Sequence, residues 1–159
     1  MVVVLVFAIF SGVLLERLHY YQEVAEKTEM EMTIRSLRNG LRARVAMLQI
    51  EGRFQQVGRL VDENPMEWLE QKPKNYLGVV RANAARGLAG GNWYFDPDSK
   101  MLVYLIRSGE HFLADAGSRK QVKLKVRIVQ SSTAQEQKLS KVDAGTGIVL
   151  QVEEPYRWF

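Results

Sequence analysis

Cysteine is absent from this 159-residue chain, and histidine occurs only twice, at His19 and His111. Without cysteine there are no disulfides, thiolate zinc sites or cysteine nucleophiles. The two histidines lie far apart in the sequence and lack the spacing of a zinc-binding helix, so a histidine-rich metal site is not expected. No carboxylate–histidine or nucleophile–base pair can be placed from the sequence. We therefore expect a protein that is not an enzyme and that needs no cofactor.

A strong excess of charge of either sign is also missing. The 22 basic and 18 acidic residues give a net charge of +4, which is too small to indicate nucleic acid as the partner. Hydrophobic residues make up 47% of the chain and charged residues 25%, which is typical of a folded protein. At roughly 150 residues per domain, the length allows one compact domain and one additional element.

The apolar residues are concentrated at the N-terminus, where the first fifteen, MVVVLVFAIFSGVLL, include no charged side chain. A helix of this length covers about 22 Å, and Leu18 with the interfacial aromatics Tyr20 and Tyr21 extends it toward the ~30 Å of a bilayer core. A cleaved signal peptide is disfavoured, because no basic region precedes the stretch and no small-residue cleavage site follows it. A buried core helix is an alternative. A membrane-anchoring helix over residues 1–21 fits best.

An amphipathic continuation of this helix is predicted over residues 22–53. No proline occurs there, and Gly40 is the only glycine before Gly52. Apolar residues recur at steps of three and four, which places them in one stripe along a helix. The stripe consists of Met30, Ile34, Leu37, Leu41, Val45 and Leu48. Such a stripe needs a surface that covers it.

Charges along the predicted helix fall into an acidic block followed by a basic block. The blocks are Glu23, Glu26, Glu29 and Glu31, and then Arg35, Arg38, Arg42 and Arg44. Glu23–Lys27 and Glu31–Arg35 have the spacing of favourable pairs on one helix face. One interpretation is a solvated face, with the arginines pointing away from the stripe. The other is that staggered parallel copies of the helix set acidic block against basic block.

Residues 54–159 are predicted to form an α/β head. Short helical segments are expected at 54–62 and 65–71, and loops at 74–91 and 131–146. Strands are expected at 92–95, 101–107, 121–130 and 147–153, the first two forming a hairpin. Residues 101–106 are apolar without alternation, as in a strand at the middle of a sheet. The fold class is therefore α+β, with a long N-terminal membrane-anchoring helix packed on a small antiparallel sheet of about four strands.

Two features of the head are candidate binding sites. Asp96 and Asp98 flank a proline, which is ordinary turn chemistry and makes them only weak calcium candidates. Lys123, Lys125 and Arg127 share one face of a strand, so the alternative function is a membrane-anchored binding module for nucleic acid or another anionic partner. Lysines on a strand's outer face are more often a solvated surface or edge protection, and nucleic acid is not the expected partner.

The order of these elements resembles that of type IV pilins and type II secretion pseudopilins. MVVVLVFAIFSGVLL is similar to the hydrophobic segment that follows the family's conserved glutamate. Residues 92–96, NWYFD, together with residues 102–104, are similar to the first hairpin of some minor pseudopilins. Met1 matches the position after that glutamate, and no basic leader ending in glycine precedes it. Leader cleavage and glutamate-dependent docking are therefore not carried over from the family.

The resemblance implies a structural, pseudopilin-like subunit of a type II secretion or type IV pilus-type assembly. It implies a single-pass protein of the bacterial inner membrane with its C-terminal head in the periplasm. The implied partners are the lipid bilayer and other pilin-like subunits or membrane components of the machine, including further copies of this chain. The residues expected to pack between helices in the membrane are Phe7, Phe10, Ser11, Gly12 and Leu14. Among these, the small residues would allow the helices to approach closely.

Overall fold

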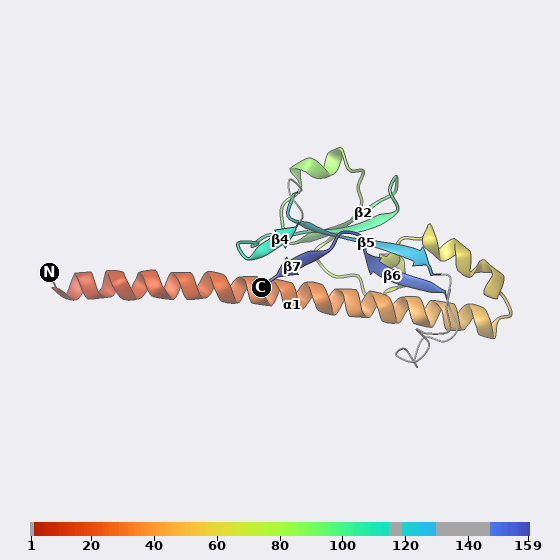
Figure 1. Ribbon diagram of the computed structural model, residues 1–159, viewed down its shortest axis with the longest axis horizontal. Coiled ribbons are helices and arrows are strands. Elements are labelled where there is room, and N and C mark those ends of the chain that lie inside the picture. The colour runs from red at the N-terminus through yellow and green to blue at the C-terminus, as the bar shows by residue number, and fades with distance from the viewer. Residues whose placement is uncertain (1, 115–118, 130–146) are drawn as a thin grey trace.

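A single long helix and a compact head make up the computed structural model, which describes residues 2–114, 119–129 and 147–159, with side chains from residue 17 onward. Helix α1 runs from Val2 to Ile50, 49 residues, and is about 74 Å long. The head lies along its C-terminal half, and its N-terminal part projects away from the head (Figure 1). Among the residues described, no helix combines the length and the apolar character needed to span a membrane.

The C-terminus of α1 is capped at Gly52, the glycine near which the sequence predicted the helix to end. Gly52 has a φ of +69°. Its backbone N–H donates to the carbonyl of Gln49 at 3.1 Å, and the N–H of Arg53 donates to the carbonyl of Leu48 at 2.8 Å. This pair of bonds is a Schellman motif, which satisfies helix carbonyls that have no partner in the next turn.

The apolar stripe of α1 is the helical half of the core, as the sequence predicted. Each of its six residues is at most 5% exposed, and Leu37 is completely buried. A five-stranded sheet covers the stripe (Figure 1). The sheet side chains that pack on it include Trp93, Phe95, Leu102, Tyr104, Val122, Leu124, Val126 and Leu150. On the other face of the sheet, Tyr94, Val103 and Leu105 form a second cluster with Ala85. The central strand is therefore apolar on both sides.

Within the described ranges, the main sheet has the order β1-β2-β3-β5-β6. Its strands are β1 Tyr76–Val79, β2 Asn92–Asp96, β3 Met101–Leu105, β5 Gln121–Ile128 and β6 Ile148–Val152. The four predicted strands are confirmed as the antiparallel series β2-β3-β5-β6. A separate two-stranded sheet joins β4, Phe112–Ala114, to β7, Tyr156–Trp158.

The prediction of a wholly antiparallel sheet of about four strands is wrong in two respects. Strand β1 pairs parallel to β2 and lies within 74–91, which was predicted to be loop. It has only four residues, with Gly78 at a φ of +90°, so its sequence carries no strand pattern. Strands β4 and β7, with three residues each, are equally short. The predicted loop at 131–146 lies outside the described residues.

Three short 3₁₀ helices complete the head, at Phe54–Val61, Pro65–Trp68 and Ala84–Gly87 within the described ranges. The first two correspond to the helical segments predicted at 54–62 and 65–71. The second is capped by Asn64, whose side chain accepts from the N–H of Met66 at 3.1 Å, but it ends earlier than predicted. It passes so close to α1 that a Cβ at Gly40 would lie 3.1 Å from the Cβ of Trp68.

Candidate functional site

The strongest cluster of charged contacts lies where α1 enters the head, and we call it the helix–head junction. On the helix it consists of one turn with two glutamates and a lysine. On the head it consists of the end of β3, the segment after it, and β7. Its residues are Glu23, Glu26 and Lys27 from α1 and Tyr104, Arg107, Ser108, His111 and Trp158 from the head.

Glu23 is the central group of the junction. Its side chain is buried, with the residue only 2% exposed. One carboxylate oxygen accepts hydrogen bonds from the backbone N–H of His111 at 3.0 Å and from Nε1 of Trp158 at 2.8 Å. The other lies 2.8 Å from Nδ1 of His111. Burial raises the pKa of Glu23, but the hydrogen bonds from His111 and Trp158 outweigh burial and hold it below its ordinary value. The buried carboxylate is therefore ionised at neutral pH.

Glu26 binds the backbone that follows β3. One of its carboxylate oxygens accepts from the Tyr104 hydroxyl at 3.0 Å and from the N–H of Arg107 at 2.6 Å. The other accepts from the N–H of Ser108 at 2.8 Å. Burial, together with the negative charge of Glu26, raises the pKa of Tyr104 far above its ordinary value, so the hydroxyl remains a donor. Glu26 thus fixes two successive backbone amides of the head to the helix.

Lys27 reaches the head from the same turn. Its Nζ donates to the backbone carbonyl of Trp158 at 2.8 Å and lies 5.5 Å from the centre of the Phe159 ring. The predicted Glu23–Lys27 pair is therefore wrong, since both side chains turn to the head. A surface pair is worth only about 0.2–0.5 kcal/mol, less than charge-assisted hydrogen bonds to partly buried groups.

The acidic block of α1 is consequently divided. Glu23 and Glu26 bind the head of their own chain, so they are not available to a neighbouring copy. Glu29 is exposed, and Glu31 lies 3.8 Å from Arg35 in the second predicted pair, which is confirmed. The interpretation in which the whole block faces a neighbour's arginines is therefore wrong for its first half.

Next to the junction, on the side of the projecting helix, four rings form a cluster that we call the aromatic collar. It consists of Tyr20 and Tyr21 from α1, His111 from the segment before β4, and Phe159 after β7. The ring of Tyr20 lies 5.7 Å from Tyr21, 6.0 Å from His111 and 5.4 Å from Phe159. His111 and Phe159 stack at 5.1 Å. Segments distant in sequence thus meet at one level of the helix.

The basic strand face is present, but most of its charge is paired. On β5, Val122, Leu124 and Val126 are buried against the helix, which leaves the intervening basic residues on the opposite face. There Lys123 lies 2.7 Å from Glu154, and Arg127 forms an ion pair with Glu153. Lys125 is partly exposed and stands opposite Gln151 of β6.

Of the two weak calcium candidates, Asp96 uses its carboxylate for hydrogen bonds within the turn. Asp96 is only 6% exposed and accepts from the N–H of Asp98 at 3.3 Å and from the Ser99 hydroxyl at 2.6 Å. Asp98 points outward, 3.9 Å from Arg81. No group of three or more side chains suited to a metal ion occurs in the part of the chain that the structure describes. The two aspartates shape the turn between β2 and β3.

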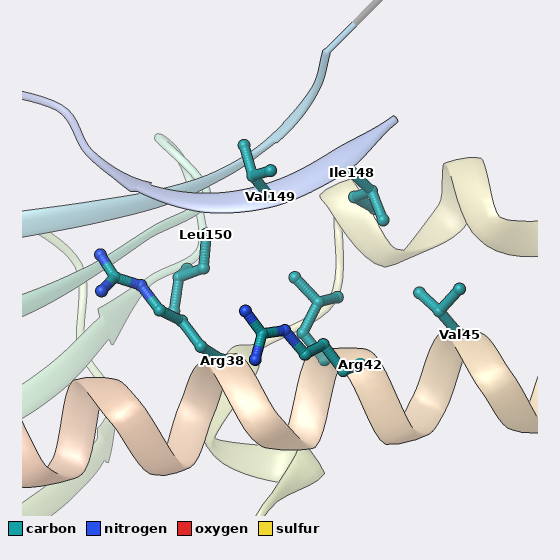
Figure 2. Close-up of a pocket in the computed structure, with 7 residues that line it drawn as sticks. Arg38, Arg42, Val45, Ile148, Val149 and Leu150 are labelled. Carbon is teal, nitrogen blue, oxygen red and sulfur yellow. The ribbon is translucent and has the colours of Figure 1, made fainter. Parts of the chain in front are cut away.

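A groove of about 290 Å³ lies between α1 and the edge strand β6. Figure 2 shows Arg38 and Arg42 rising from the helix toward β6, with Ile148 and Leu150 pointing down toward α1. Both arginines are exposed, as their positions off the apolar stripe predicted, and their side chains line the groove. Each directly follows a stripe residue in the sequence, which places it at the border of the stripe.

The remaining predicted site residues are those for packing between helices in the membrane, Phe7, Phe10, Ser11, Gly12 and Leu14. The structure places them on the projecting part of α1, and their side chains lie outside the described residues. Comparison of the chain with protein-family models, curated proteins and solved structures gives no significant match.

Proposed function

We propose that this chain is a structural, non-enzymatic, pseudopilin-like subunit of a type II secretion or type IV pilus-type assembly. Residues 1–21 would hold it in the bacterial inner membrane, and the head would lie in the periplasm. The observation that carries the proposal is the division of α1 into two parts. The second part is built into the core of the head, whereas the first projects beyond it as an unbroken helix (Figure 1).

The projecting part of α1 needs a partner outside the head. Its sequence, MVVVLVFAIFSGVLL, has no charged side chain, and each large apolar residue transferred from water gains roughly 1.5–3 kcal/mol. A bilayer, or the equivalent helices of other subunits within a bilayer, supplies such an environment. Ser11 and Gly12 are small enough to let two helices approach closely.

The helix–head junction supports a structural role. Its titratable groups join one segment of the chain to another, and Glu23 and Glu26 use both of their carboxylate oxygens in these contacts. These contacts consequently fix the orientation of the head relative to the helix. Such rigidity suits a subunit whose head position is set by the packing of its helix.

The alternative, a binding module that uses the basic strand face, is not favoured by the geometry. Lys123 and Arg127 are already paired with carboxylates of their own chain. A nucleic-acid phosphate would have to displace Glu154 and Glu153 before it could use these two charges.

Membrane fractionation with cysteine cross-linking tests the proposal. The chain has no cysteine, so Leu14→Cys gives a unique reporter. After expression in a host that has a type II secretion machine, we expect the protein in the carbonate-washed membrane pellet. We expect oxidation to yield cross-linked copies or cross-links to partner subunits with a cysteine at the same level.

A pair of double variants serves as a matched comparison. Replacing Ser11 and Gly12 by leucine should abolish the cross-links while leaving the protein in the pellet, because bulk is added without polarity. Replacing the same two residues by alanine should preserve both. Protein that stays in the supernatant after carbonate washing would contradict the anchor. Cross-links unaffected by the leucine pair would contradict packing through the small residues.

A further inference from the structure

We propose that the aromatic collar, formed by Tyr20, Tyr21, His111 and Phe159, is a docking surface for the phospholipid headgroup layer. The head then rests on the membrane instead of standing clear of it. The inference depends on the proposed function, because it requires residues 1–21 to lie in a bilayer. It adds a lipid contact made by the head itself, through residues far from the anchor in the sequence.

The collar is exposed despite its aromatic composition. Tyr21 is 63% exposed, and Tyr20 and Phe159 are each 42% exposed. Tyrosine and other amphipathic rings are enriched at the boundary between lipid and water, where one edge is apolar and the other is hydrated. Nearby, Leu18 on α1 and Leu113 on β4 are also more than half exposed. Each stands two positions from a collar residue in the sequence, Leu18 from Tyr20 and Leu113 from His111.

The level of the collar on α1 matches the thickness of the headgroup layer. Tyr20 stands five residues beyond Leu15, the last residue of the uncharged stretch, which corresponds to about 7.5 Å of helix rise. The headgroup layer on each side of a bilayer is about 5–8 Å thick. If the uncharged stretch ends at the hydrocarbon boundary, the collar lies within the headgroups.

The junction holds the head's two rings at this depth. His111 is bound through its backbone and its ring to Glu23, and the residue before Phe159 is bound to both Glu23 and Lys27. These contacts lie within two turns of Tyr20. His111 and Phe159 therefore occupy the depth of Tyr20 whenever the helix is inserted, unless the buried hydrogen bonds break.

The charges around the collar are compatible with lipid headgroups. Arg17 is exposed on α1 three residues before Tyr20, whereas the guanidinium of Arg107, in the junction, lies against Gly91 of the head. Glu23 and Glu26 are engaged by the head, whereas Glu110, next to His111, is exposed and its charge opposes that of Arg17. Arginine near an anionic surface favours membrane contact.

Spin labelling of the full chain tests the inference. Single cysteines at Tyr21, Phe159 and Ile50 are labelled with a nitroxide, and the protein is reconstituted in vesicles of phosphatidylethanolamine and phosphatidylglycerol. Ile50 is the control, because it is 87% exposed and stands about 45 Å farther along α1. We expect a water-soluble nickel relaxant to reach the label at 159 several-fold less than the label at 50, and about as little as the label at 21.

Three other outcomes overturn the inference in different ways. A label at 159 as accessible as that at 50, with the label at 21 protected, means that the head stands clear of the membrane while the anchor holds. If the label at 21 is also accessible, the anchor and the proposed function fail together. If the protection of the label at 159 is lost when the protein is diluted with excess lipid, while the label at 21 stays protected, a second copy covers the collar.

Discussion

Replacement of Glu23 is the most direct test of the helix–head junction. In Glu23→Ala, Nε1 of Trp158 and the backbone N–H of His111 lose their acceptor in a site that is almost closed to water. Each buried donor left without a partner costs about 1–3 kcal/mol. For the two donors together we therefore expect the free energy of unfolding to fall by about 2–6 kcal/mol. Glu23→Gln keeps the shape and one acceptor oxygen, so it should cost less, about 1–2 kcal/mol.

The assay is urea unfolding of the full chain in a mild detergent, with tryptophan fluorescence as the measure of unfolding. Glu29 on the same helix is exposed and serves as the matched control, and Glu29→Ala should change the free energy of unfolding by no more than about 0.5 kcal/mol. Equal losses from Glu23→Ala and Glu29→Ala would show that the buried hydrogen bonds do not hold the head to the helix.

The pH dependence of the free energy of unfolding is a second, independent test of the role of Glu23. The pKa of Glu23 is lower in the folded chain than in the unfolded chain, so the unfolded chain binds more protons in the intervening pH range. The contribution of Glu23 to stability is therefore complete above the ordinary carboxyl pKa and is lost as the pH falls through the lowered value. Glu23→Gln should remove this part of the acid dependence, whereas a profile identical to that of the unmodified chain would refute the assignment.

Three further predictions concern the fold and the alternative function. Leu37→Ala should cost about 2–5 kcal/mol in the same unfolding assay, and Met32→Ala, on the exposed side of α1, within about 0.5 kcal/mol; equal costs would mean that the stripe is not a core face. Gly52→Ala should lower the free energy of unfolding by about 1–2 kcal/mol, because Gly52 has a positive φ. Gly58 has an ordinary φ and free space where a Cβ would lie, so Gly58→Ala should not destabilise the protein. Lys123→Ala should leave retention on single-stranded DNA unchanged, and a marked loss would support the binding module instead.

The sequence predicted those parts of the fold in which a pattern repeats. The stripe of α1 repeats over five helical steps, and residues 121–126 alternate cleanly along β5. The parallel edge strand β1 was missed because four residues with a central glycine carry no such pattern. Strands β4 and β7 were also missed, because each has only three residues and their pairing joins residues more than forty positions apart.

The helix–head junction was missed for a different reason. A glutamate on a helix usually faces water, and the partners of Glu23 lie 88 and 135 positions away in the sequence. One signal was available, because Glu23 stands seven residues before Met30, which continues the line of the stripe by two turns. An acidic residue in line with an apolar stripe can indicate a buried carboxylate whose partners come from the covering surface.

The bond between Glu23 and Trp158 also constrains the order in which the chain folds. It closes a loop of 135 residues, for which the entropy of closure alone is about 4 kcal/mol. The bond cannot form during synthesis until β7 has left the ribosome. By then the stripe of α1 and strands β2 and β3 have already been synthesised. The bond between Glu23 and Trp158 is therefore a late folding event, whereas the contacts of Glu26 with Tyr104, Arg107 and Ser108 close shorter loops and can form earlier.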